Sequence, residues 1–101
     1  MTIFQILQTL GIPAAYSHFK ENGPVSPPYI VYIGGGQYTK DADNTHYYRR
    51  NQYQIEYYFT KKDEQIEAEI ENKLLENGYL YEKSEDVYIE DEGVFVIYYT
   101  V

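Results

Sequence analysis

The stretch from His46 to Thr60 constrains the fold of this 101-residue chain more than any other segment. Its second half alternates, with one set of apolar and aromatic residues at the odd positions: Tyr53, Ile55, Tyr57 and Phe59. A period of two is typical of a strand with one buried face. At about 3.3 Å per residue the run would span about 45 Å, more than a small domain needs. We therefore expect its polar start, residues 47–51, to project beyond the core as a hairpin arm.

Two segments have the spacing and boundaries of amphipathic helices. In the first, Thr2 is a candidate N-cap for residues 3–10, and Gly11 and Pro13 form a stop. In the second, Asp63 is the candidate N-cap and Gly78 the end. The apolar stripe of the first helix is Ile3, Ile6, Leu7 and Leu10. The stripe of the second is Ile66, Ile70 and Leu74, widened by Ala68 and Leu75, and its expected solvated face is Glu64, Glu67, Glu69, Glu71 and Glu76.

The remaining strand candidates are short. Residues 29–33 are apolar on both faces, which predicts an interior strand covered on both sides. Further strands are expected at 15–19, 79–81, 87–89 and 94–101, with a loop at 21–28 and turns at 83–86 and 90–93. The three glycines at 34–36 precede no Lys-Ser/Thr pair and no helix, so we interpret them as a flexible connection or bulge into a mobile loop over 34–45.

The resulting order is α-β-β-β-α-β-β. This order predicts an α+β fold, with a mostly antiparallel sheet and two helices packed on one side of it. The length suits one domain over residues 1–101.

Charge and composition exclude several classes of function. The chain has no cysteine, so thiolate metal sites, disulfides and cysteine nucleophiles are excluded. It has neither an apolar run long enough for a membrane span nor a basic N-terminus, so we expect a soluble protein that is neither exported nor membrane-bound. The formal charge of -8 disfavours binding to nucleic acid. All of that charge falls in residues 61–101, either as a solvated surface or as a surface that meets the Arg-bearing part of another chain.

No residue pattern supports catalysis or a cofactor. Ser17 and His18 are adjacent on an expected strand, so their side chains should point apart. The spacing of Asp41, Asp43 and Thr45 resembles the start of a calcium loop, but His46 and Gln52 occupy the diagnostic glycine and glutamate positions. The carboxylates at 86 and 90–92 are more often simply solvated than metal-bound. We therefore expect a protein that is not an enzyme and that holds no metal.

Tyrosine is the strong compositional signal, with 14 residues, and this residue type serves both strands and interfaces. We expect Tyr53, Tyr57 and Tyr98 in the core. The candidate contact surface is instead in and beside the 34–45 segment, where arginine adjoins tyrosine, although an ordinary pair of exposed strand charges would give the same pattern. The candidate interaction residues are Tyr38, Tyr47, Tyr48, Arg49 and Arg50, with Asp86, Glu90 and Asp91 as partial acidic partners.

Four segments together resemble a known family. They are the sequences at 12–19 (Ile-Pro-Ala-Ala-Tyr-Ser-His-Phe), 27–32 (Pro-Pro-Tyr-Ile-Val-Tyr), 57–63 (Tyr-Tyr-Phe-Thr-Lys-Lys-Asp) and 82–90 (beginning Glu-Lys-Ser-Glu). The chain resembles, over nearly its whole length, the tail-terminator or tail-completion proteins of long-tailed phages and prophages of Gram-positive bacteria. It departs from that pattern at residues 59–62, where a more polar turn is expected after the tyrosines.

The resemblance implies a non-enzymatic virion protein at the tail-head junction. Such a protein assembles as a ring, expected to be a hexamer, at the head-proximal end of the tail tube, where it ends tube polymerisation and joins tail to head. Its implied partners are further copies of itself, the major tail tube protein and a head-completion or neck protein, while DNA passes through the lumen without specific binding. The alternatives are a neck adaptor protein and, in a different class, an acidic inhibitor that mimics DNA.

Overall fold

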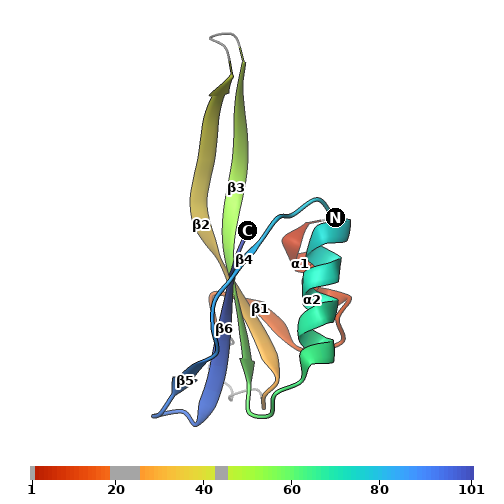
Figure 1. Cartoon of the computed structure of the whole chain (residues 1–101), viewed down its shortest axis with the longest axis vertical. Helices are drawn as coiled ribbons and strands as arrows, with labels where there is room; N and C mark the ends of the chain where they lie inside the picture. Colours follow the sequence, from red (N-terminus) through yellow and green to blue (C-terminus); the bar gives the residue numbers. More distant parts are fainter. Residues whose placement is uncertain (1, 19–25, 43–45) are drawn as a thin grey trace.

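The computed structural model describes residues 2–18, 26–42 and 46–101, and for residues 36–42 and 46–51 it describes the backbone. The described part is α+β, with two helices on one side of a six-stranded mixed sheet (Figure 1). The order of elements is α1-β1-β2-β3-α2-β4-β5-β6. Three strands follow α2, which agrees in number with the segments expected there, although the predicted order counted two.

The first helix, α1, spans Ile3–Gln8 and begins as predicted. The Thr2 hydroxyl accepts a hydrogen bond from the Gln5 N–H, and the Gln5 side chain accepts one from the Thr2 N–H, so the two residues form a reciprocal capping box. The buried residues of this helix are Ile3, Ile6 and Leu7.

The second helix, α2, spans Glu64–Glu76, and Asp63 caps it by accepting hydrogen bonds from the N–H groups of Gln65 and Ile66. Its buried stripe is narrower than expected. Ala68 and Leu75 are exposed, and the helix buries Glu67 together with Ile70 and Leu74. The expectation that Glu67 is solvated is therefore wrong.

The sheet has the strand order β1-β2-β3-β6-β4, with β5 also paired to β6. The first strand, β1 at Ala14–Tyr16, runs parallel to β2 at Tyr29–Ala42. The pairs β2·β3, β3·β6, β4·β6 and β5·β6 are antiparallel. Phe19, the last residue of the strand expected at 15–19, and the first part of the loop expected at 21–28 lie outside the described residues.

The strand β2 is interior, as predicted, but it is much longer than five residues. It continues through the glycines to Ala42 and pairs there with β3, His46–Phe59, so the mobile loop expected over 34–45 is wrong for 34–42. The rest of that loop lies outside the described part of the chain. The expected bulge is present between Gly34 and Gly36. The burial expected on both faces of 29–33 holds for Ile30, Val31 and Tyr32, while Ile33 is exposed.

The C-terminal third differs from the prediction in its pairing. Residues 79–81 are not a strand, because Gly78 takes a φ of 82° and the Tyr79 N–H then donates to the Leu74 carbonyl, which closes α2. The strands β4, Glu82–Lys83, and β5, Val87–Ile89, both pair with β6, Val94–Thr100.

The core lies between the helices and the facing side of the sheet. Tyr57 is in it, and Tyr53 packs partly against it. Tyr98 is not, because β6 turns its neighbour Tyr99 inward instead. The core cluster is Ile3, Leu7, Ile30, Tyr32, Ile55, Tyr57, Phe59, Ile70, Leu74, Ile97, Tyr99 and Val101.

Candidate interaction surfaces

The most prominent feature of the molecule is a two-stranded arm formed by the distal halves of β2 and β3. The strand β1 pairs with β2 only at residues 30–32, and β6 pairs with β3 only at residues 54–59. Beyond Gly36 and Gln52 the two arm strands pair with each other, in continuous register to Ala42 and His46. Figure 1 shows this hairpin rising well clear of both helices. The arm predicted from residues 47–51 is therefore confirmed.

The root of the arm is braced on both sides. On one side the Tyr16 hydroxyl accepts a hydrogen bond from the Gly34 N–H at 3.4 Å, and the Tyr16 ring meets the Tyr32 ring edge-on at 5.2 Å. On the other side Tyr53 and Val101 exchange backbone hydrogen bonds of 3.3 and 3.0 Å. The arm is therefore a continuous extension of the core sheet, and its base is fixed by these contacts.

Five of the sequence-predicted interaction residues lie on the arm. In the backbone register Tyr38 pairs with Arg50, Tyr48 with Lys40 and Tyr47 with Asp41, and Arg49 pairs with the residue at position 39. The structure thus brings all five onto one hairpin, although they are separated by up to 12 positions in the sequence. Only the backbone of these five residues is described, so their side-chain contacts are outside the described part of the structure.

The three predicted acidic residues do not form one cluster. Asp86 precedes β5 and forms an ion pair with Lys62, with Nζ to Oδ2 at 3.1 Å. Glu90 and Asp91 lie exposed in the turn after β5, which closes when Gly93, at a φ of 66°, donates its N–H to the Ile89 carbonyl. Asp86 is therefore held by its own chain, whereas Glu90 and Asp91 face solvent.

The arm and this acidic turn lie at opposite ends of the long axis, as Figure 1 shows, and the molecule measures 50 × 29 × 25 Å. The two surfaces therefore cannot meet within one chain. They can meet only between chains.

The interpretation of Ser17 and His18 needs a correction. β1 ends at Tyr16, and Ser17 takes a left-handed φ of 66°, so the alternation of a strand does not apply to it. The Ser17 hydroxyl lies 3.2 Å from the His18 Nδ1, at an exposed position. Among the described residues no group of three or more His, Asp or Glu side chains is placed to hold a metal ion.

A cluster of charged residues that sequence reasoning missed joins α2 to the sheet. Glu67 is 3% exposed, and its two carboxylate oxygens contact Lys62 at 2.7 Å and Lys83 at 2.9 Å. Lys83 also pairs with Glu71 at 2.8 Å. The signal was present in the sequence, since positions 67, 70, 71 and 74 follow the i, i+3, i+4, i+7 spacing of one helix face.

Hydrogen bonds from two tyrosines complete this cluster. The Tyr99 hydroxyl donates to Glu71 at 2.8 Å and the Tyr81 hydroxyl at 3.2 Å. Burial opposes ionisation of Glu71, but Lys83 and both hydroxyls hold the pKa of its carboxyl below the usual value. Burial likewise opposes the charge of Lys83, yet the two carboxylates hold its pKa above the usual value. Glu71 and Lys83 are therefore both charged at neutral pH, and their pairing anchors α2 to the sheet.

The sheet face opposite the helices is a second surface rich in tyrosine. Tyr29 and Tyr58 stack there with ring centroids 4.9 Å apart, and the Tyr58 hydroxyl donates to Glu56 at 2.6 Å. Burial, followed by this bond, raises the pKa of Tyr58. Within the described ranges both helices lie on the other side (Figure 1). Half-buried tyrosines of this kind are common in protein interfaces.

No helix of the described residues has the length and hydropathy that a membrane crossing requires. Comparison of the chain with protein families, with curated proteins and with solved structures gives no match.

Proposed function

We propose that this chain is a structural protein of a phage virion, a terminator that forms a ring on the head-proximal end of the tail tube. In this role it ends tube polymerisation and presents a surface to a head-completion or neck protein. It works in the virion, at the tail-head junction, after assembly in the host cytoplasm. The fold would then be of the tail-terminator type.

The observation that carries the proposal is the arm. A strand pair that extends beyond the core exposes backbone groups on both outer edges, and such edges serve to pair with another chain. A ring of identical subunits needs two different surfaces that meet head to tail. The arm is one such surface, and the acidic turn at the opposite end of the molecule is a different one, so each is open to a neighbouring copy. The likeness of four sequence segments to tail terminators supports the same role.

The charge distribution favours this role over a DNA mimic. A mimic needs free carboxylates along an extended face. Here Glu67, Glu71 and Asp86 are engaged by Lys62 and Lys83, so three of the acidic side chains of residues 61–101 are not free carboxylates. An acidic lumen surface would still let DNA pass without binding, since it repels phosphate.

The test is electron microscopy of tail tubes that are polymerised from major tail protein with and without this chain. The added chain carries a label. Label at one tube end, together with shorter tubes, supports a terminator. Unlabelled tubes of unchanged length would contradict it and favour a neck adaptor, which a binding assay against the portal side would then detect.

A charge reversal tests the role of the arm. We expect the double substitution Arg49→Glu and Arg50→Glu to abolish capping while circular dichroism shows a folded chain. Arg50→Glu alone should weaken capping, and Lys73→Glu, which changes the net charge equally from the last turn of α2, should not. Unchanged capping by the double variant would remove the arm from the interface.

A further inference from the structure

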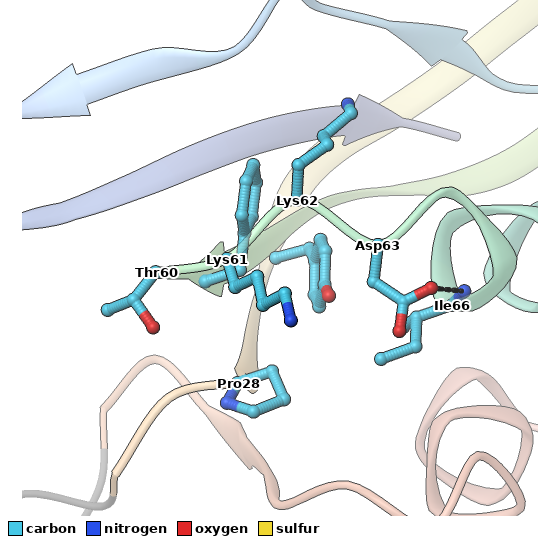
Figure 2. Close-up of a pocket in the computed structure, with 8 residues that line it drawn as sticks. Pro28, Thr60, Lys61, Lys62, Asp63 and Ile66 are labelled. Atoms are coloured by element: carbon cyan, nitrogen blue, oxygen red, sulfur yellow. Dashed lines mark hydrogen bonds between the residues drawn. The ribbon is translucent and has the colours of Figure 1, made fainter.

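The corner where β3 leaves the sheet and α2 begins contains a hollow of about 220 Å³. Its lining comes from the end of β3, the corner residues 60–63, the first turn of α2 and Pro28. In Figure 2 the ammonium group of Lys61 extends over Pro28, and the carboxylate of Asp63 faces the same space from the start of the helix. The hollow belongs neither to the arm nor to the acidic turn.

Tyr57, which lines this hollow, has a hydroxyl group with no hydrogen-bond partner among the described residues, although its side chain is 0% exposed. Burial, with the nearby charges of Glu67 and Asp63, raises the pKa of Tyr57 to about 12. The group is therefore a neutral donor at neutral pH. A buried hydroxyl without a partner is rare and calls for an acceptor.

Lys61 supplies a second donor. Its neighbour Lys62 is engaged by Glu67 and Asp86, whereas Lys61 forms no ion pair with any described residue. Asp63 also faces the hollow, but its Oδ1 accepts the N–H groups of Gln65 and Ile66, so the positive end of α2 offsets part of its charge. The hollow therefore presents an ammonium and a buried phenol, a pairing that suits a carboxylate.

The chain itself carries matching carboxylates. Glu90, Asp91 and Glu92 are exposed in the tight turn between β5 and β6, and within the described part of the chain they form no ion pair. Among the described residues they form no ion pair with Lys61, and none of them accepts a hydrogen bond from the Tyr57 hydroxyl. Charge complementarity between this turn and the hollow can thus be satisfied by a second copy.

We propose that the hollow at the β3–α2 corner binds a carboxylate of the 90–92 turn of a second copy of this chain. Lys61 pairs with this carboxylate at the mouth of the hollow, and the side chains that cover the buried Tyr57 hydroxyl move aside so that the hydroxyl donates to it. The contact is heterologous, since turn and hollow are different surfaces, so it propagates from copy to copy as a ring requires. It rests on the proposed function in using a second copy as the occupant, and it assigns the acidic turn to this hollow, so that the arm contacts another surface of the neighbour or the tube.

The experiment is sedimentation equilibrium of the full chain over a wide concentration range, with variants. We expect the wild type to self-associate and Lys61→Glu to raise the dissociation constant at least about tenfold, because like charges then face each other. Lys73→Glu, with the same change of net charge, should have little effect. Reversing the turn, with Glu90→Lys, Asp91→Lys and Glu92→Lys, should also weaken association, and combining it with Lys61→Glu should restore it.

Tyr57→Phe separates binding from folding. We expect it to raise the dissociation constant by about two- to tenfold, from the loss of one hydrogen bond. The melting temperature of the dissociated chain should stay constant or rise, because the hydroxyl has no partner there. A lower melting temperature with unchanged association would overturn the proposal and assign the hydroxyl to an internal water. A monomeric wild type, or a combined variant that fails to regain association, would also overturn it. Tube capping is scored separately, so either proposal can fail without the other.

Discussion

Glu67 shows how one residue joins three parts of the chain. It lies on α2, and its carboxylate contacts Lys62 from the β3–α2 corner and Lys83 from β4. The two lysines keep part of their side chains in water, at 43% and 34% exposure, whereas the Glu67 side chain is 4% exposed. The buried carboxylate therefore depends on both partners.

Replacing Glu67 should destabilise the fold. We expect Glu67→Ala to lower the free energy of unfolding by about 2 kcal/mol, below the range for fully buried pairs because both lysines can return to water. Glu69→Ala, on the exposed face of the same helix, should change it by less than about 0.5 kcal/mol. Urea denaturation at pH 7 measures both, and equal values for the two variants would show that the Glu67 contacts contribute nothing.

Glu71 should make stability depend on pH in acid. Its pKa is lowered in the folded protein, so its contribution is complete above the ordinary value of 4.5 and is lost as the pH falls through the lower folded value. The wild type should therefore lose more stability than Glu71→Gln between pH 6 and about pH 3. For Lys83, whose pKa is raised, the contribution is complete below 10.5 and is lost only at higher pH. If the free energy of unfolding falls equally with pH in the wild type and in Glu71→Gln, the role assigned to Glu71 is contradicted.

At the scale of elements, the arm should be separable from the fold. Among the residues whose side chains are described, the core cluster contains none between 35 and 52. Replacing residues 35–52 by Asn-Gly would join Gly34 to Tyr53 with a two-residue hairpin turn. We expect a cooperatively folding protein within about 1 kcal/mol of the wild type, because closure entropy depends weakly on loop length. Thermal denaturation followed by circular dichroism tests this, and loss of a cooperative transition would mean that the arm supports the core.

The elements that sequence predicts well are those with strong local patterns. The alternation at 53–59 and the capped stripe after Asp63 gave a strand and a helix with nearly correct ends. The distal half of β2 has no such pattern, since it is polar and starts at three glycines, and only its pairing with β3 makes it a strand. The parallel pairing of β1 with β2 is likewise set by contacts between residues distant in sequence. The same holds for the pairing of both β4 and β5 with β6.

The same division applies to the interaction surfaces. The arm residues were identifiable because a strand of that length had to leave the core. The hollow beside Tyr57 was not, because its members come from Pro28 and from the β3–α2 corner, which are far apart in the chain. Glu67 pairs with Lys62 and not with Lys61. This choice depends on the direction in which each lysine side chain points at the corner, and a periodic sequence pattern does not specify that direction.

At the scale of the whole molecule, the arm determines the shape. The radius of gyration over Cα atoms is 15.0 Å. A compact chain of this length would have about 13 Å. Small-angle scattering of the dissociated wild type should give at least the larger value, and the variant that lacks residues 35–52 should fall to about 12 Å. Similar values for the two proteins would mean that the hairpin folds back on the core in solution.

The β-bulge at the root of the arm affects the direction of the hairpin but not the pairing of its strands. Tyr53 pairs with Gly34 and the next residue back, Gln52, pairs with Gly36, so Gly35 is the extra residue of the bulge. Loss of Gly35 would leave every partner between Tyr29 and Ala42 unchanged. What would change is the local bend and twist that a bulge adds, and with them the direction in which the tip is aimed. A chain of this design can thus redirect its hairpin toward a differently placed neighbour by losing one glycine, with no new strand pairing to evolve.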